Sequence, residues 1–129
     1  FLGYLEPDAL RRVTQQAWLG LNLLENRGLS YYYSLSNKVL DYIHAGLPQI
    51  AMAFPEYRRI NARWEVAVLL DEATPEAIVE AVQSLHADPE RYARLQNNCL
   101  EARKHLHWNA VAPGLVCFYR NLERRDVPR

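Results

Sequence analysis

Several features that would assign a chain quickly to a class of protein are missing from this sequence. Its 129 residues include 15 basic and 15 acidic side chains, so it lacks the basic excess typical of nucleic-acid-binding domains. No apolar run approaches the roughly 20 residues of a membrane-spanning helix, and no stretch resembles a secretory signal peptide. We therefore expect a cytoplasmic protein that binds no nucleic acid.

Cysteine is scarce as well. Cys99 and Cys117 stand alone on apolar helix faces, which predicts two reduced core thiols rather than a disulfide or a metal pair. His105 and His107 are two residues apart, so a helix would point them to different sides and a zinc pair is not expected. His44 is expected to be exposed. The sequence predicts no metal site.

What the chain does have is enough apolar sequence for one core. Half of its residues are hydrophobic, which argues against disorder, and this length fits a single domain. Segments 18–24, 49–54 and 66–70 are almost continuously apolar, as in parallel strands covered on both faces. Helical patterns alternate with them, which predicts an α/β fold with a parallel sheet flanked by helices. Segment 1–4 resembles the end of a further strand, so the chain looks like a piece of a longer one.

Helix boundaries are marked by capping residues and proline. Pro7, Pro55, Pro75 and Pro89 each suit a first helical position, and Thr74 and Asp88 suit N-caps. Segment 25–35 is expected to be a loop. The helix after Pro75 should bury one apolar face, composed of Ile78, Val79, Val82 and Leu85.

The last segment also has a helical pattern. One face is predicted to hold Trp108, Val111, Leu115, Phe118 and Leu122. The pair Pro113-Gly114 interrupts the pattern and predicts a kink or a break.

The stretch from Ser30 to Phe54 organises the rest of the chain. Ser36 is a good N-cap for a short helix that Gly46 and Pro48 would end. Helical spacing places an apolar set toward a core: Val39, Leu40, Ile43 and Leu47.

The start of this short helix has a chemical interpretation. A helix N-terminus carries partial positive charge and free N–H groups, which suit a phosphate or diphosphate. Lys38 would add a cation there, and Asp41, one turn later, could accept hydrogen bonds from ribose hydroxyls. An ordinary surface helix of mixed charge explains the same pattern. Tyr31, Tyr32 and Tyr33 could stack on a base or sugar, although packing is the commoner use of such tyrosines.

The order of these pieces resembles a known family. The segment SNKVLDYIHAGLPQIA, then Pro55-Glu56, a valine-rich strand, and helices opening Thr-Pro-Glu-Ala and Asp-Pro-Glu-Arg are similar to the C-terminal domain of GT-B glycosyltransferases. The closest group is the retaining family-4 type, and the similarity covers nearly the whole chain. It implies part of a Rossmann-like domain: a nucleotide-sugar-binding unit at 1–106, incomplete at its N-terminus, and a C-terminal crossing helix and tail at 107–129.

The family's donor motif can be carried over only in part. Asp41 falls at the second of its two glutamates, which holds the ribose, although Asp is shorter by one C–C bond of about 1.5 Å. Tyr33 falls at the first glutamate, which contacts the transferred sugar, so sugar identity and stereochemistry stay open. The family's glycine-rich phosphate loop corresponds here to Ser34, Leu35, Ser36, Asn37 and Lys38. We expect the backbone N–H groups of Asn37 and Lys38 to meet the diphosphate.

The resemblance implies a transferase that moves a sugar from a nucleotide-diphosphate donor to a glycan or lipid-linked acceptor. It implies no metal and no cofactor besides the donor, and no catalytic residue is identified. The acceptor domain would lie outside this sequence, so the chain alone is expected to be inactive. The parent enzyme would serve cell-envelope polysaccharide synthesis in the cytoplasm or at the inner face of the membrane. The C-terminal helix could pack against a second copy.

Two alternatives remain. One is a nucleotide-sugar epimerase of the same fold, which should carry catalytic acids and a histidine that we do not find. The other is a non-enzymatic α/β interaction module. A response-regulator receiver would need an acidic cluster after its first strand, and a flavodoxin-like module would bind flavin.

Overall fold

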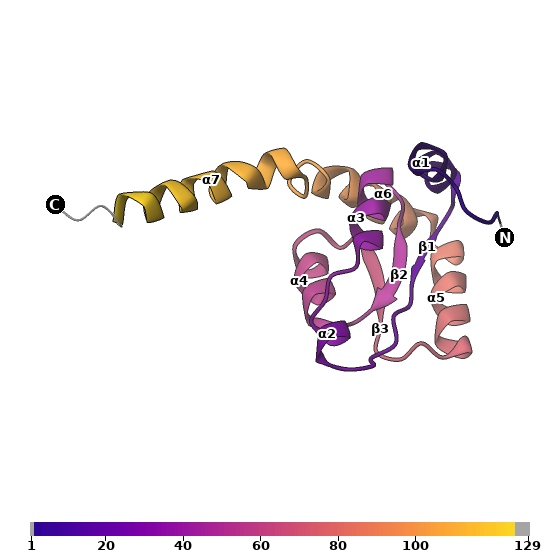
Figure 1. The fold of residues 1–129 in the computed structure, drawn as a ribbon. Helices are drawn as coiled ribbons and strands as arrows, with labels where there is room; N and C mark the ends of the chain where they lie inside the picture. Colours follow the sequence, from indigo (N-terminus) through magenta and orange to yellow (C-terminus); the bar gives the residue numbers. More distant parts are fainter. Residues whose placement is uncertain (1, 126–129) are drawn as a thin grey trace.

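The protein is built on a small parallel sheet. The computed structural model describes residues 2–125, with side chains as far as Leu122. The sheet found there has three strands in the order β1-β2-β3, which are Gly20–Asn22, Gln49–Met52 and Ala67–Leu70. Both neighbouring pairs run parallel. This confirms an α/β protein with a parallel sheet flanked by helices (Figure 1).

The helices begin close to the predicted capping signals. They are α1 (Pro7–Gln16), α2 (Leu29–Tyr32), α3 (Asn37–Ala45), α4 (Pro55–Trp64), α5 (Pro75–Ala87), α6 (Pro89–Ala102) and α7 (Trp108–Arg125). Thr74 Oγ1 accepts from the Ala77 amide at 3.2 Å, and Asp88 Oδ1 accepts from the Arg91 amide at 2.9 Å. These two predicted N-caps are confirmed, because each satisfies a backbone N–H that a helix start leaves free.

Helices surround the sheet on both faces and at one end. Figure 1 shows α4 and α5 on opposite sides of the sheet. α6 lies across the amino ends of two strands. There the Cys99 thiol donates to the carbonyls of Leu47 and Val66 at 3.7 and 3.8 Å. The carboxyl end of the sheet is therefore left to loops and to the short helix α2 (Figure 1).

The core forms where these helices meet the sheet. Val39, Ile43 and Leu47 are buried as predicted, while Leu40 is only partly buried. Ile50 and Leu95 are completely buried as well. Each large apolar side chain taken from water contributes about 1.5–3 kcal/mol, so this contact between α3, β2 and α6 supplies much of the stability.

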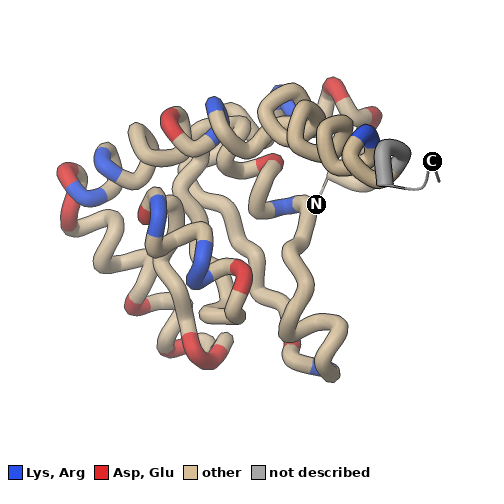
Figure 2. Tube along the Cα trace, turned by 90° about the vertical axis from the view of Figure 1, so that its left-hand side faces the viewer, with Lys and Arg blue, Asp and Glu red and all other residues tan. Residues whose placement is uncertain are grey.

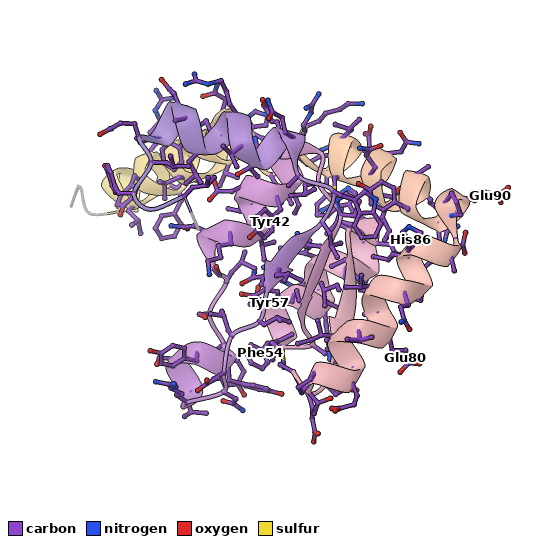
Figure 3. The ribbon with its side chains drawn as sticks, turned by 90° about the vertical axis from the view of Figure 1, so that its right-hand side faces the viewer. Tyr42, Phe54, Tyr57, Glu80, His86 and Glu90 are labelled. Atoms are coloured by element: carbon purple, nitrogen blue, oxygen red, sulfur yellow. The ribbon has the colours of Figure 1, made fainter. Side chains whose placement is uncertain are left out.

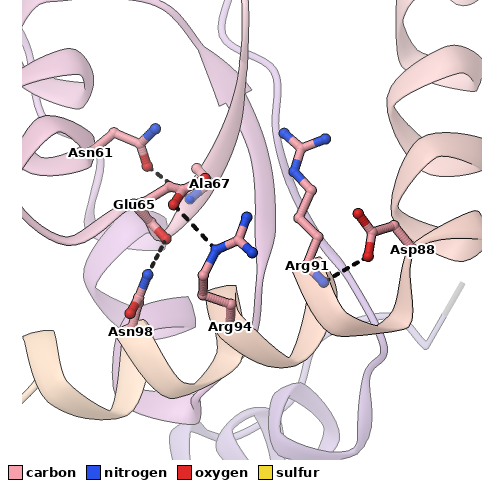
Figure 4. A network of polar contacts seen from close by, with 7 residues as sticks. All are labelled: Asn61, Glu65, Ala67, Asp88, Arg91, Arg94 and Asn98. Atoms are coloured by element: carbon pink, nitrogen blue, oxygen red, sulfur yellow. Dashed lines mark hydrogen bonds and ion pairs between the residues drawn. The ribbon is translucent and has the colours of Figure 1, made fainter.

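A polar network secures the junction between α4 and β3 (Figure 4). Glu65 ends α4 in the left-handed region at φ 46°, and its carbonyl accepts from the Asn98 side chain at 3.2 Å. Asn61 Oδ1 accepts from the Ala67 amide at 2.9 Å, and Arg94 pairs with Glu65 at 3.5 Å. Side chains from α4 and α6 thus hold the backbone where it enters β3.

The N-terminal part differs from its prediction. Residues 2–5 form no strand, so the expected fourth strand remnant is wrong for the described part of the chain. The predicted strand 18–24 shrinks to β1, and its Leu21 is 47% exposed, because β1 lies at the edge of the described sheet and one face is not covered. Trp18 instead stacks on Tyr92 at 5.2 Å. The predicted loop 25–35 contains the short helix α2.

The predicted apolar face of α5 is wrong at one residue. In α5, Val79 is 52% exposed, while Ala81 and Leu85 are buried. Of the kink or break predicted at Pro113, the break does not occur, because α7 continues through this residue. A proline inside a helix removes one backbone hydrogen bond, and the bonds formed by the residues around it are enough to continue this helix. The final residues of the predicted tail, 126–129, lie outside the described part.

The two cysteines have different surroundings. Cys99 is buried as predicted, and burial raises the pKa of its thiol to about 12. Cys117 is exposed on α7, so the prediction of a second core thiol is wrong. None of the described helices combines the length and the apolar character needed to cross a membrane.

Candidate functional site

The start of α3 is held by two hydrogen bonds at one residue. Ser36 has extended backbone angles, and its Oγ accepts from the Lys38 amide at 3.2 Å. Its own amide donates to the Tyr57 hydroxyl, also at 3.2 Å. The predicted N-cap at Ser36 is therefore confirmed. Gly46 ends the helix in the left-handed conformation at φ 69°, also as predicted.

This helix start lies at the carboxyl end of the sheet. Tyr57 belongs to α4, which begins three residues after the end of β2, so its bond to Ser36 ties α3 to that edge. Figure 3 shows Phe54 and Tyr57 between α3 and the segment that holds α2. Ligands of open parallel α/β sheets bind beyond the carboxyl ends of the strands. The start of α3 therefore lies where a fold of this kind can bind a ligand.

An aromatic cluster supports the loop before α3. Tyr32 is partly buried, with its ring 5.4 Å from that of Phe54, and Phe54 contacts Tyr57 edge-on at 6.1 Å. Tyr31 and Tyr33 are 45% and 61% exposed. Packing thus explains Tyr32, while the rings of Tyr31 and Tyr33 remain accessible to a ligand.

The predicted phosphate loop is only partly open to a ligand. Ser34 Oγ donates to the Tyr31 carbonyl at 2.9 Å, and Leu35 packs against the core. The Lys38 amide already donates to Ser36, whereas the amide of Asn37 forms no hydrogen bond with a described residue. A diphosphate would therefore meet the Asn37 amide directly and would share the Lys38 amide with the cap.

Lys38 and Asp41 are exposed and unpaired. They are three residues apart, yet neither forms an ion pair with any described residue. Three other pairs at the same spacing do close: Asp8–Arg11, Glu56–Arg59 and Glu101–Lys104. In those pairs the acid precedes the base, which is the more favourable order on a helix. The reversed order at Lys38 and Asp41 leaves both charges available to a ligand.

Tyr42 connects this helix to the edge strand. Its hydroxyl donates to the Leu21 carbonyl at 3.3 Å, and a Cβ at Gly20 would lie 2.6 Å from its ring. Burial raises the pKa of Tyr42, against the hydrogen bond to Leu21, and the nearby carboxylate of Asp41 raises it further. Glycine is needed at position 20 because the ring occupies the space of any side chain.

The sequence interpretation missed a buried amide next to this site. Asn22 ends β1 and is completely buried, and neither its Nδ2 nor its Oδ1 has a partner among the described residues. Side chains alternate along a strand, so Asn22 faces α3 as Gly20 does, but nearer the carboxyl end. The signal was present in the sequence, because Asn22 is the one polar residue within the apolar run 18–24.

Gln49 is a second buried amide on the same face. Its Nε2 donates to the Val39 carbonyl at 3.4 Å, while its Oε1 has no partner among the described residues. It lines a cavity of about 10 Å³ together with Tyr57 and Asn61. That volume is close to the minimum for one water molecule, which would satisfy the free oxygen.

The histidines do not join the site. His44 is exposed as predicted, and its Nε2 lies 2.8 Å from the Leu106 carbonyl, which links α3 to the segment before α7. His105 stacks on Trp64 at 6.0 Å. The described residues contain no group of three His, Cys, Asp or Glu side chains close enough to hold a metal ion.

Searches of family models, of curated proteins and of solved structures found no match to this chain. The interpretation of the site therefore depends on its residues and their geometry.

Proposed function

We propose that this chain is the donor-binding part of a glycosyltransferase that transfers a sugar from a nucleoside diphosphate to a glycan or lipid-linked acceptor. The observation that carries the proposal is the start of α3. Its N-terminus is capped by Ser36 and bonded to Tyr57 in the first turn of α4, and Lys38 and Asp41 are exposed and form no ion pair with a described residue. These groups match the diphosphate and the ribose of a nucleoside diphosphate.

Each group has a distinct role in the proposal. The Asn37 amide and the Lys38 ammonium bind the diphosphate, which the positive end of the helix dipole also favours. Asp41 accepts hydrogen bonds from the ribose hydroxyls. Tyr33, which is exposed in the loop before Ser36, would contact the transferred sugar.

Asn22 gives independent support for a polar ligand near this edge. A buried amide without partners costs about 1–3 kcal/mol, so such a group in a folded protein calls for an explanation. A ligand, or a water that a ligand orders at the carboxyl end of β1, would complete its hydrogen bonds.

The chemistry would be electrostatic. As the glycosidic bond breaks, negative charge accumulates on the departing nucleoside diphosphate, and the helix N-terminus and Lys38 stabilise it. Acceptor binding would come from a domain outside this sequence. In this proposal the present chain recognises the donor but does not carry out the complete reaction.

Calorimetric titration with UDP, GDP and ADP tests the proposal. We expect one of them to bind, and Asp41→Ala to lose about 1.5–3 kcal/mol, which is roughly ten- to more than a hundredfold in affinity. Glu80→Ala is the matched control, because Glu80 is an exposed carboxylate on α5, on the other side of the sheet (Figure 3). Binding that both variants weaken equally, or no binding of any nucleotide at millimolar concentration, would contradict the proposal.

A further inference from the structure

α7 is the least supported element of the structure. It extends away from the body of the protein in Figure 1. At 1.5 Å per residue, an 18-residue helix is about 27 Å long. Isolated helices of this length are marginal in water, and most helical stability in proteins comes from packing an apolar face. α7 therefore needs a partner surface more than any other helix in the described part.

The apolar face of α7 has the pattern of a helix–helix seam. Its members alternate at spacings of three and four residues: Trp108, Val111, Leu115, Phe118 and Leu122. They are 67, 57, 44, 58 and 40% exposed. This spacing is that of the a and d positions of a coiled coil, whose narrow stripe packs against another helix. We call these five side chains the α7 seam.

Charge does not oppose contact between two copies of the seam. From Trp108 to Tyr119 the helix carries no acidic or basic residue, and most of the helix that leads to the C-terminus is tan in Figure 2. The positions beside the seam include Ala112 and Gly114, which are small enough for a second helix to approach closely. A seam of this kind is complementary to itself.

We infer that the α7 seam is a self-association surface, and that its occupant is the seam of a second copy of this chain. The same patch on both partners gives a closed, two-fold symmetric dimer. This inference is independent of the proposed donor site, because no seam residue belongs to that site.

The available area predicts a weak dimer. Covering the exposed parts of five side chains, two of them aromatic, removes on the order of 500 Å² per copy from water. The total of about 1,000 Å² is near the lower limit of specific interfaces. We therefore expect a dissociation constant in the micromolar range, with monomers in dilute solution.

Analytical ultracentrifugation over a range of protein concentrations tests the inference. The weight-average mass should rise from the 15.0 kDa of one chain toward twice that value. Phe118→Glu places like charges opposite each other in the seam and should weaken the dimer at least about tenfold. Ala110→Glu adds the same charge to an exposed position of α7 outside the seam and should change the dissociation constant less than about twofold.

Circular dichroism supplies a second readout. If the seam pairs, helix content should rise with protein concentration in the unchanged protein and in Ala110→Glu, but not in Phe118→Glu. A strict monomer at millimolar concentration would overturn the inference. Association that Phe118→Glu leaves intact would overturn it as well, since the contact would then lie elsewhere.

Discussion

The sequence predicts an apolar face for both α3 and α7, but only the apolar face of α3 is buried in the tertiary structure. α3 buries Val39 and Ile43, is capped by Ser36 and ends at Gly46. α7 is twice as long, contains Pro113 and leaves its apolar face exposed. An apolar stripe therefore predicts that a helix has a surface to bury, but not that the partner surface belongs to the same chain.

The largest difference between the two regions should be the rate at which their cysteine thiols react with an alkylating reagent. Cys117 lies on exposed α7, and Cys99 lies in the core that α3 shares with α6. With iodoacetamide near pH 8, we expect Cys117 to react on the order of a thousandfold faster, because Cys99 must first be exposed by opening of the fold. Mass spectrometry of timed samples measures both rates. Equal rates would show that the core is open.

The Cys99 thiol should make the free energy of unfolding depend on pH in the alkaline range. The folded-state pKa of Cys99, about 12, lies above the ordinary value of 9.0. The protonated thiol therefore contributes stability below pH 9, and this contribution is lost as the pH rises through 12. Cys99→Ala should flatten the fall in unfolding free energy across this window, and Cys117→Ala should leave it unchanged.

Truncation of an apolar side chain should have opposite consequences in the two helices. Ile43 is completely buried, so Ile43→Ala should cost about 2–5 kcal/mol of unfolding free energy. Leu115→Ala removes a similar group from α7 and should stay within about 0.5 kcal/mol in dilute solution, where the protein is monomeric. Urea titrations measure both. A large cost at Leu115 would mean that α7 already packs within one chain.

The glycines of α3 and α7 should respond differently to substitution by alanine. Gly46 has φ 69°, and a Cβ there would lie 2.8 Å from Leu100 Cδ2, so Gly46→Ala should cost about 1–2 kcal/mol. Gly114 lies inside α7 with no atom within 4 Å of an added Cβ. Gly114→Ala should leave the global unfolding midpoint unchanged and should increase helix content, since alanine favours a helix by about 1 kcal/mol. A loss of helix in this variant would contradict the assignment of α7.

The candidate site was predictable where local chemistry determines it. Ser36 and Gly46 show the start and the end of α3 in the sequence, and both were identified correctly because capping depends on neighbours a few residues away. The hydrogen bond from the Ser36 amide to the Tyr57 hydroxyl joins residues 21 positions apart, and no local sequence pattern indicates it. The unpartnered amide of Asn22 became evident only when the strand was seen to bury it.

Capping residues and proline were enough to predict where α1 and α3 to α6 begin, and hydrophobic spacing was enough to predict which side of α3 is apolar. These features depend on capping groups, on proline and on hydrophobic spacing, all of which act within one or two turns. The tertiary structure was needed to show that Leu21 and Val79 face outward, that Cys117 is exposed, and that the α7 seam has no partner among the described residues. Burial depends on which other elements arrive at a face, and that is set by contacts between distant parts of the chain or between chains.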